Sequence, residues 1–309
     1  MTVYSEYYKR FRCIADRCKH NCCIGWEIDI DEDTARYYAQ VTGDFGKRLK
    51  ESISQNDGIF SFRLREDERC PFLSDKNLCT VIEELGEDAL CEICRMHPRY
   101  RNFYSEREEL GLGLCCEEAA RIVLTETDKM HLVTEAGDVP EDAACEEREF
   151  FKLRDWIFTR LQERDKPLSV RAGEIAAKLS LPADIRSLDA WKEIFASLEC
   201  LDPNWPKVLS SIAPCDWKKE DEAVRVPAEQ LISAFVYRHF AKVLDGESYV
   251  AVLSFCFLSL RVICALWNAH KRRTGALKVE DMVELARMYS AEIEYSPENT
   301  EALLRVFEG

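Results

Sequence analysis

Residues 13–26, CIADRCKHNCCIGW, place four cysteines and a tryptophan in fourteen positions. The chain has 15 cysteines in 309 residues, and ten of them precede residue 117. These ten form short groups along the sequence, at positions 13, 18, 22 and 23, at 70 and 79, at 91 and 94, and at 115 and 116. A thiolate metal site draws its ligands from short groups that the fold brings together. We therefore expect a metal-binding region here, ordered more by metal than by a large apolar core.

The cysteine count leaves the metal open between an iron–sulfur cluster and zinc. One tetrahedral zinc site takes four ligands, so eight to ten cysteines exceed a single site. Cysteine thiolates also hold iron–sulfur clusters. Adjacent residues such as Cys22 and Cys23 cannot easily direct both sulfurs to one metal, so each adjacent pair is expected to give one thiolate to a given site. The three-cysteine motif of radical enzymes is absent, since the cysteine after Cys22 follows immediately.

Beyond about residue 125 the apolar residues recur with the 3.6-residue period of an α-helix. In FFKLRDWIFTRLQER, residues 150–164, one face carries Phe150, Leu153, Ile157 and Leu161. Further helices are predicted within residues 171–180, 187–201, 227–244, 249–267 and 278–295. The expected fold class is mainly α. We expect a loop-rich cysteine-cluster region, residues 1–125, to pack on a C-terminal helical domain, residues 126–309.

The cysteine-rich part shows a few local signals of its own. Helical spacing follows the acidic residues at 31–33 and continues again from Glu117. FSFRLRE, residues 60–66, alternates apolar and polar residues as a strand does. The stretches SQNDG (54–58) and LSDKN (73–77) are typical of turns.

The longest apolar run, YVAVLSFCFLSLRVICALW (249–267), carries Arg261 near its middle, which is costly at the centre of a bilayer. We expect a buried core helix rather than a membrane span, with Cys256 and Cys264 acting as small hydrophobic residues. The first residues, MTVYSEYYKRFRC, do not resemble a secretory signal, so we expect a cytoplasmic protein. The net charge of −15 argues against nucleic acid as a partner. It would attract a basic, lysine-bearing segment, although a solvating surface is the commoner reason for such acidity.

The cysteine motifs, taken in order, resemble those of the flagellin lysine-N-methylase family. The motifs are FRC-x4-C-x3-CC-x2-W-x-IDID, CPFL-x5-C, LCEICRMHPR and LCCEEAAR. The first hundred or so residues are also similar to a wider group of cysteine-cluster proteins described as zinc- or iron-chelating. MYSAEIEYSPENTEALL (288–304) resembles the closing helix of the family, so the resemblance covers most of the chain.

The resemblance implies methyl transfer from S-adenosylmethionine to lysine amines of flagellin, by a protein that holds a [4Fe-4S] cluster. Zinc is the alternative metal. Eight cysteines match the family's pattern and are the implied ligands: Cys13, Cys18, Cys22, Cys23, Cys70, Cys79, Cys94 and Cys116. Cys91 and Cys115 match it less closely. Where the family commonly shows Ser-Cys-Pro, this chain has Cys115-Cys116-Glu117, so which thiol of that pair is the ligand stays open.

Such a reaction requires a deprotonated lysine, whose pKa in solution is roughly 10.4. A site must therefore lower that pKa or remove the proton. Tyr8 and His97 are the candidate catalytic groups, although a structural hydrogen bond is the more frequent role for a histidine placed as His97 is. Aromatic residues near the thiols, among them Trp26 and Tyr38, offer either a pocket for the sulfonium of the donor or ordinary packing.

Two other functions stay open. One is a non-enzymatic zinc- or iron-binding module whose helical half recognises a partner. The other is a redox enzyme, which would need a recognisable cofactor or partner site, and the sequence offers none.

Overall fold

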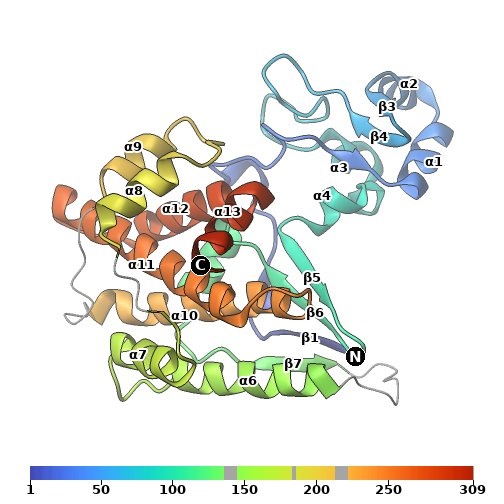
Figure 1. Cartoon of the computed structure of the whole chain (residues 1–309). Coiled ribbons are helices and arrows are strands. Elements are labelled where there is room, and N and C mark those ends of the chain that lie inside the picture. Colours follow the sequence, from blue (N-terminus) through green and yellow to red (C-terminus); the bar gives the residue numbers. More distant parts are fainter. Residues whose placement is uncertain (136–144, 183–185, 213–221, 309) are drawn as a thin grey trace. The chain divides into compact units, whose positions relative to one another are not determined.

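The computed structural model describes residues 1–135, 145–182, 186–212 and 222–308. The chain divides into two compact units (Figure 1). Unit 1 comprises Met1–Phe11 and Arg101–Gly309, and unit 2 comprises Arg12–Tyr100. The sequence placed a boundary near residue 125 instead. The units divide elsewhere because the first strand of the chain pairs with strands that follow residue 100.

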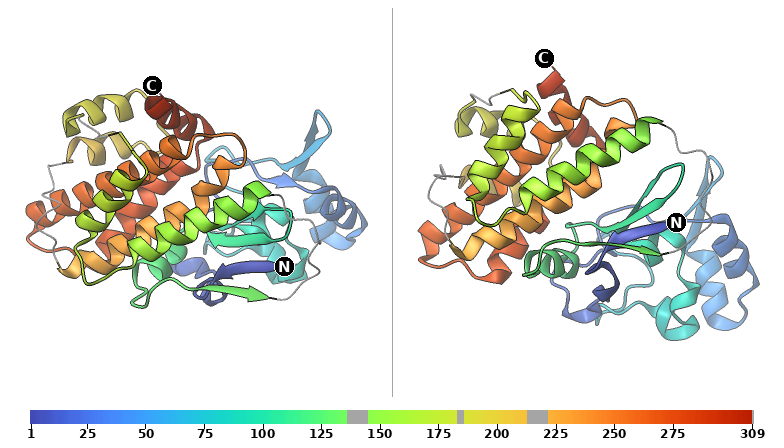
Figure 2. Two further views of the ribbon diagram at one scale, coloured as in Figure 1. Left: turned by 60° about the horizontal axis from the view of Figure 1, so that its bottom comes forward. Right: turned by 90° about the horizontal axis from the view of Figure 1, so that it is seen from below.

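A four-stranded sheet connects the two sequence segments of unit 1, because β1 of the first segment lies between β6 and β7 of the second (Figure 2). Its order is β5 (Arg99–Phe103), β6 (Glu108–Leu112), β1 (Thr2–Ser5) and β7 (Leu132–Glu135). β1 runs parallel to β6, with Val3 opposite Glu109, and antiparallel to β7. The sequence did not predict this sheet, because its strands have four or five residues and β1 pairs with β6 and β7 over more than a hundred positions.

Helices make up the rest of unit 1, so a mainly α fold is confirmed for this part of the chain. They are α5 (Glu117–Leu124), α6 (Cys145–Leu161), α7 (Leu168–Lys178), α8 (Leu188–Ala196), α9 (Trp205–Ser210), α10 (Glu222–His239), α11 (Tyr249–Thr274), α12 (Val279–Tyr289) and α13 (Pro297–Glu308). Short 3-10 turns occur at η1 (Tyr8–Arg10) and η4 (Phe240–Val243), and a π-helical turn at η5 (Ser290–Glu294). On α6, Phe150, Ile157 and Leu161 are buried and Leu153 is half-buried, as their spacing predicts.

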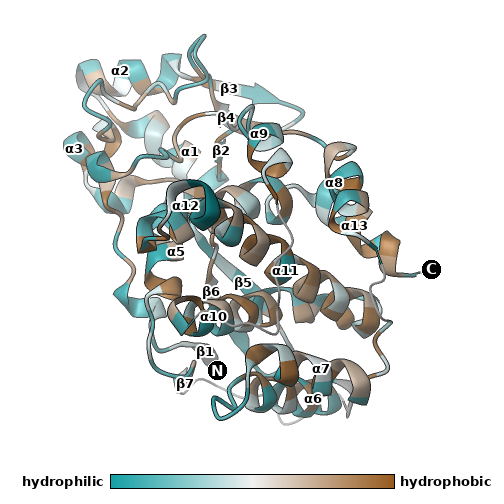
Figure 3. Ribbon diagram, turned by 90° about the vertical axis from the view of Figure 1, so that its left-hand side faces the viewer, coloured by the Kyte–Doolittle hydropathy of each residue, from teal (hydrophilic) through white to brown (hydrophobic). Residues whose placement is uncertain are grey.

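The predicted apolar helix, α11, lies in the core of unit 1. It begins at Ser248, whose hydroxyl accepts a hydrogen bond from the amide of Val250 (3.2 Å), and it ends at Gly275 in the left-handed conformation. By length and composition α11 is able to cross a membrane, but 78% of its most apolar window is buried inside the protein. Hydrophobic residues recur along its ribbon in Figure 3, and both Cys256 and Cys264 are buried. α11 is therefore a core helix.

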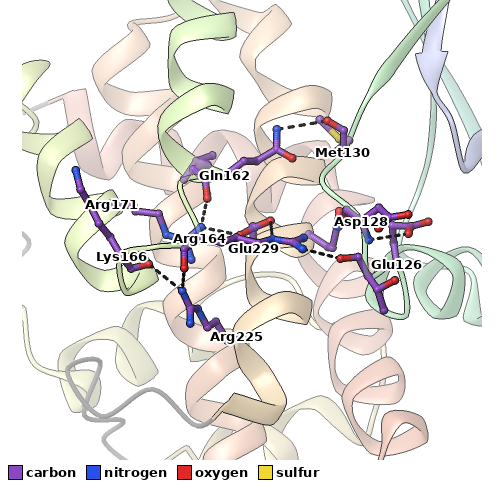
Figure 4. Close-up of polar contacts among 12 residues, drawn as sticks. Glu126, Asp128, Met130, Gln162, Arg164, Lys166, Arg171, Arg225 and Glu229 are labelled. Atoms are coloured by element: carbon purple, nitrogen blue, oxygen red, sulfur yellow. Dashed lines mark hydrogen bonds and ion pairs between the residues drawn. The ribbon is translucent and has the colours of Figure 1, made fainter.

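Buried ion pairs connect the helices of unit 1 to one another. Glu229 on α10 accepts hydrogen bonds from Arg164 (2.9 Å) and Arg171 (2.6 Å), as Figure 4 shows for the surrounding network. Arg154 on α6 makes a two-pronged pair with Glu109 on β6, with both distances 2.6 Å. Arg154, Arg171, Glu109 and Glu229 have 0–1% exposed side chains, so these contacts fix the helices where water cannot replace them.

Unit 2 has four short helices: α1 (Glu32–Gln40), α2 (Gly43–Glu51), α3 (Thr80–Leu85) and α4 (Glu92–Met96). The 3-10 turns η2 (Ala15–Arg17) and η3 (Glu87–Ala89) also belong to it. Asp31 starts α1, because its carboxylate accepts a hydrogen bond from the amide of Thr34 (2.9 Å). The predicted acidic helix start is therefore confirmed.

The sheet of unit 2 is antiparallel and has three strands, in the order β2 (Asp29–Ile30), β4 (Ile59–Phe62) and β3 (Ile53–Asn56). Asp57 and Gly58 connect β3 to β4, and both have positive φ, which suits a two-residue hairpin turn. The predicted turn at 54–58 and the strand that begins the 60–66 stretch are both present.

Candidate metal centre

Three segments of unit 2 carry cysteines into one apolar core. Cys70 and Cys91 are among its buried residues, and Cys23, Cys79 and Cys94 pack against it. The sequence anticipated metal in place of a large core, whereas unit 2 has an apolar core that contains the thiols themselves.

Backbone hydrogen bonds align the segment that contains Cys23 with the segment that contains Cys70. The amide of Cys70 donates to the carbonyl of Cys23 (2.8 Å), and Ile24 forms a bridge with Arg69. Gly25 has a φ of +83°, which favours glycine, and its amide donates to the carbonyl of Glu68 (3.1 Å). The chain after Cys23 is therefore aligned against the chain before Cys70.

The loop from Cys70 to Cys79 closes on itself. Leu73 and Cys79 form a bridge, and the amide of Thr80 donates to the carbonyl of Phe72 (2.8 Å). The amide of Asn77 donates to the carbonyl of Ser74 (2.9 Å), which makes the turn predicted at 73–77. Nine residues apart in sequence, Cys70 and Cys79 lie at the two ends of a closed loop.

The third segment is the start of α4. The amide of Glu92 donates to the second carboxylate oxygen of Asp31 (2.8 Å), so the residue that starts α1 also holds the start of α4. Cys91 immediately precedes this helix and is 1% exposed. Cys91 and Cys94 are one helical turn apart and their thiols hydrogen-bond, which lowers the pKa of Cys91 and raises that of Cys94.

Cys23, Cys70, Cys79, Cys91 and Cys94 all belong to this apolar core or pack against it, and we refer to them as the five-thiol cluster. Burial raises the pKa of Cys70 to about 11, and Cys79 and Cys91 add to this effect. Cys94 also interacts with Cys23 and Cys70, while Cys23 interacts with Cys70 and Cys79. Each member thus interacts with at least two others, although the five come from three separate segments.

The remaining predicted ligands of unit 2 lie outside this cluster's core. Cys22 is exposed and hydrogen-bonds Cys23, which raises the pKa of Cys23. Cys13 is exposed and its sulfur accepts a hydrogen bond from the amide of Ala15 (3.4 Å). The half-buried Cys18 donates its thiol to the carbonyl of His20 (3.1 Å). Of the adjacent pair, Cys23 is the member that packs against the core.

Cys116 belongs to unit 1, where it directly precedes α5 and its amide donates to the carbonyl of Gly113 (3.4 Å). Burial raises the pKa of Tyr295, and the neighbouring Cys115 adds to this effect. The part that Cys116 plays in a metal site stays a prediction.

The five-thiol cluster fits a thiolate-binding metal by its chemistry. Its donors are all soft sulfurs, the ligands that zinc and iron–sulfur clusters take. Within the part of the chain that the structure describes, no three His, Cys, Asp or Glu side chains already form a metal-binding arrangement. The identity of the ligands and of the metal is therefore a matter for proposal and experiment.

The aromatic residues near the thiols differ in their surroundings. Tyr38 is 1% exposed, its hydroxyl donates to the carbonyl of Ala89 (2.7 Å), and burial raises its pKa. Trp26 is half-buried, packs against the same core, and has its ring centroid 5.8 Å from that of His97. Packing therefore accounts for Tyr38, while Trp26 lies at the edge of the core.

The two candidate catalytic residues belong to different units. His97 is half-buried, and burial lowers its pKa to about 4, so its imidazole is neutral at pH 7. Tyr8 begins η1 in unit 1 and is half-buried, with its ring centroid 5.5 Å from that of Tyr4. Their catalytic roles stay predictions.

One residue was ranked low by the sequence analysis and one pair was missed. Cys91 matched the family pattern less closely, but it is buried in the core, and its C-x2-C spacing with Cys94 is the signal that could have raised its rank. The buried pair of His239 and Glu294, with Nε2 and Oε1 2.6 Å apart, lies at the π-helical turn η5. Fifty-five residues separate that pair, so no local pattern marks it.

Residues 227–309 match a family model described as the FliB lysine N-methylase C-terminal domain. The chain is 27% identical over 132 residues to a lysine-N-methylase of Salmonella typhimurium, and 28% identical over 137 residues to one of Salmonella choleraesuis. Each match covers 41% of this chain and 33% of the relative, so the chain spans about a third of the length of these two proteins.

A third relative is the flagellar biosynthetic protein FliU of Salmonella muenchen, 28% identical over 137 residues. This match covers 41% of the chain and 78% of the relative. No solved structure is similar to the chain. The comparisons agree with the resemblance that the cysteine motifs and the closing helix predicted.

Proposed function

We propose, from this confirmed resemblance to the flagellin lysine-N-methylase family, that the chain is a protein-lysine N-methyltransferase. The observation that carries the proposal is the match of residues 227–309 to the lysine N-methylase C-terminal domain. S-adenosylmethionine is the proposed methyl donor, and flagellin or a similar lysine-bearing protein is the proposed substrate. The cytoplasm is the proposed location of the reaction.

A [4Fe-4S] cluster held in unit 2 is the proposed metal group, with zinc as the alternative. Cys23, Cys70, Cys79, Cys91 and Cys94 supply more thiols than the four that either group takes. When bound, the metal would supply folding energy to a unit of 89 residues that contains short helices and many loops. The exposed Cys22 is the natural substitute if one of the five stays unligated.

Methyl transfer to a lysine needs the amine in its neutral form, because the protonated amine has no lone pair for attack on the sulfonium. Carbon–nitrogen bond formation is then matched by cleavage of the carbon–sulfur bond of the donor, and one proton leaves the nitrogen. Burial lowers the pKa of His97 to about 4, so its imidazole is neutral at pH 7 and is a candidate for accepting a hydrogen bond from the amine rather than for holding its proton. Tyr8 remains the second candidate for positioning the amine.

The test is incubation of the purified protein with isotope-labelled S-adenosylmethionine and flagellin, followed by mass spectrometry of the lysines. We expect added methyl groups on flagellin lysines and none in a reaction without the protein. If the intact, metal-loaded protein adds no methyl group to any lysine, the proposed activity is wrong.

A non-enzymatic metal-binding module is the second candidate function, and the five-thiol cluster favours it independently of the family match. The visible spectrum of protein purified without oxygen separates the metals. A brown protein with a broad band near 400 nm indicates iron–sulfur. A colourless protein with stoichiometric zinc and no methylation would support the module instead.

A further inference from the structure

The loop between Cys70 and Cys79 carries two thiols of the five-thiol cluster and begins with a tight turn. Pro71 is the second residue of this turn, a position that favours proline, and the amide of Leu73 closes the turn by donating to the carbonyl of Cys70 (3.0 Å). Phe72 and Leu73 are 1% and 2% exposed, so the turn is anchored in the apolar core of unit 2. The turn therefore sets the direction in which the chain leaves Cys70 towards Cys79.

Two carbonyl groups of this turn depend on side-chain donors. Among the described residues, no backbone amide donates to the carbonyl of Pro71 or to that of Leu73. Arg65, which follows β4, donates from Nη2 to both carbonyls, each at 3.2 Å. Arg48 on α2 also donates to the carbonyl of Pro71, and its guanidinium lies 5.0 Å from the centroid of the Phe72 ring. We refer to Arg48 and Arg65 as the arginine clamp.

The far part of the loop is held separately, by Arg69. Its guanidinium donates to the side-chain oxygen of Asn77 (2.8 Å) and to the carbonyl of Ser74 (3.4 Å). The arginine clamp therefore acts on the turn next to Cys70 alone. Arg48 and Arg65 are both exposed, so replacing either of them removes hydrogen bonds to the turn without leaving a cavity or a buried charge.

We propose that Arg48 and Arg65 are positioning residues for the bound metal, an inference that rests on the proposed thiolate metal site. The clamp keeps the turn closed, and the closed turn keeps the thiols of Cys70 and Cys79 in the core. A bound metal becomes accessible to a competing ligand when this loop opens. The hydrogen bonds of the clamp exist only in the closed loop, so losing one arginine raises the open fraction by the factor that its hydrogen bonds contribute.

The experiment measures how fast the full chain, purified without oxygen, loses its metal to an excess of a chromophoric chelator of iron or zinc. Arg65→Gln and Arg48→Gln should each release the metal about three- to tenfold faster than the wild type, which is the factor expected for one or two such hydrogen bonds. Arg65→Lys should recover part of the slow release, because an ammonium group also donates to carbonyls. If Arg65→Gln is purified without metal, Arg65→Lys supplies the release rate.

Arg63→Gln is the matched control. Arg63 is exposed in the same segment, and within the described part of the chain its guanidinium makes no hydrogen bond or ion pair. This variant removes the same charge and should release the metal at the wild-type rate. Amide hydrogen exchange locates the effect. In Arg65→Gln, exchange should quicken in peptides that span residues 70–80 and stay unchanged in the hairpin of residues 53–62, because the clamp holds the loop rather than the whole unit.

Equal release rates from the clamp variants and Arg63→Gln overturn the inference and leave the metal site standing. Exchange that quickens as much in residues 53–62 as in residues 70–80 also overturns it, because the arginines then support unit 2 as a whole. Elemental analysis of the wild type separates both results from a failure of the proposed metal site. A wild-type chain that holds neither iron nor zinc removes that site, and the inference falls with it.

Discussion

Replacing Glu229 by alanine should destabilise unit 1 far more than any exposed ion pair does. Its carboxylate is 1% exposed and neutralises Arg171, which is 0% exposed, and Arg164, which is 29% exposed. Removing it leaves the guanidinium of Arg171 buried without its carboxylate. Breaking one side of such a buried pair costs about 3–5 kcal/mol. In a unit of this size, that loss lowers Tm by roughly 6–20 °C.

The assay is thermal unfolding followed by far-ultraviolet circular dichroism, which reports the helices of unit 1. Glu301→Ala is the control, because its pair with Arg305 is exposed and should contribute less than about 0.5 kcal/mol. Glu229→Gln should fall between the two, since the amide oxygen still accepts one hydrogen bond but carries no charge. A Glu229→Ala protein that melts within about 2 °C of the wild type would refute the view that this network fixes α7 against α10.

Three more predictions follow from the same structure. Gly46→Ala should destabilise unit 2 by about 1–3 kcal/mol, because the added carbon overlaps the backbone carbonyl of Val41. Gly173→Ala is the control and should stabilise unit 1 by about 0.5–1 kcal/mol, because the added carbon meets open space in α7. Urea unfolding measures the free energy of unfolding of both variants. Burial lowers the pKa of His239, so as the pH falls the unfolded chain binds a proton at this residue before the folded chain does, and stability decreases below about pH 6.5. The Tm of His239→Gln should therefore decline less with falling pH than the Tm of the wild type. Parallel declines in the two proteins would contradict this prediction. Cys94→Ala should lose bound metal and stability together. Cys256→Ala should keep the metal and lose roughly 1–2 kcal/mol of stability. Elemental analysis measures the metal and thermal melting measures the stability, and full metal content in Cys94→Ala would exclude that thiol as a ligand.

Helices were predictable where the sequence alone contains the cause of folding. The apolar period of residues 150–164 gives the buried face of α6, and the acidic residue before α1 gives its start. The run that became α11 was recognisable as a core helix because Arg261 interrupts it. In each case the deciding contacts lie within a few residues of one another.

The sheet of unit 1 was not predictable for the opposite reason. β1 consists of four residues and pairs with β6 and β7, which follow it by more than a hundred positions. Nothing in TVYS itself selects those partners. The same holds for Glu109 and Arg154, whose charges were visible in the sequence but whose burial depends on the finished packing.

The spacing of the cysteines predicted a shared site, but not the contacts that bring their segments together. The short groups at 22–23, 70–79 and 91–94 indicated a shared site, and in the structure Cys70 is buried in an apolar core against which Cys23, Cys79 and Cys94 pack. Family-pattern matching ranked Cys91 lower, yet its place before α4 is set by a hydrogen bond from Glu92 to the distant Asp31. A contact of this kind between α4 and α1 has no signature in either segment.

The family match to residues 227–309 marks a stretch of similar sequence rather than a separate folding unit. α10, which begins before that stretch, packs on α5, α6 and α7, and α12 also packs on α5. The hydroxyl of Tyr237 donates to the carbonyl of Val3 (3.2 Å), and the side-chain amide Nδ2 of Asn102 donates to the carbonyl of Arg238 (3.2 Å). Every residue from 228 to 237 is buried, and α10 has packing partners both inside the matched stretch, in α11, and outside it. In this chain the matched stretch therefore completes its packing with β1 and α5 to α7.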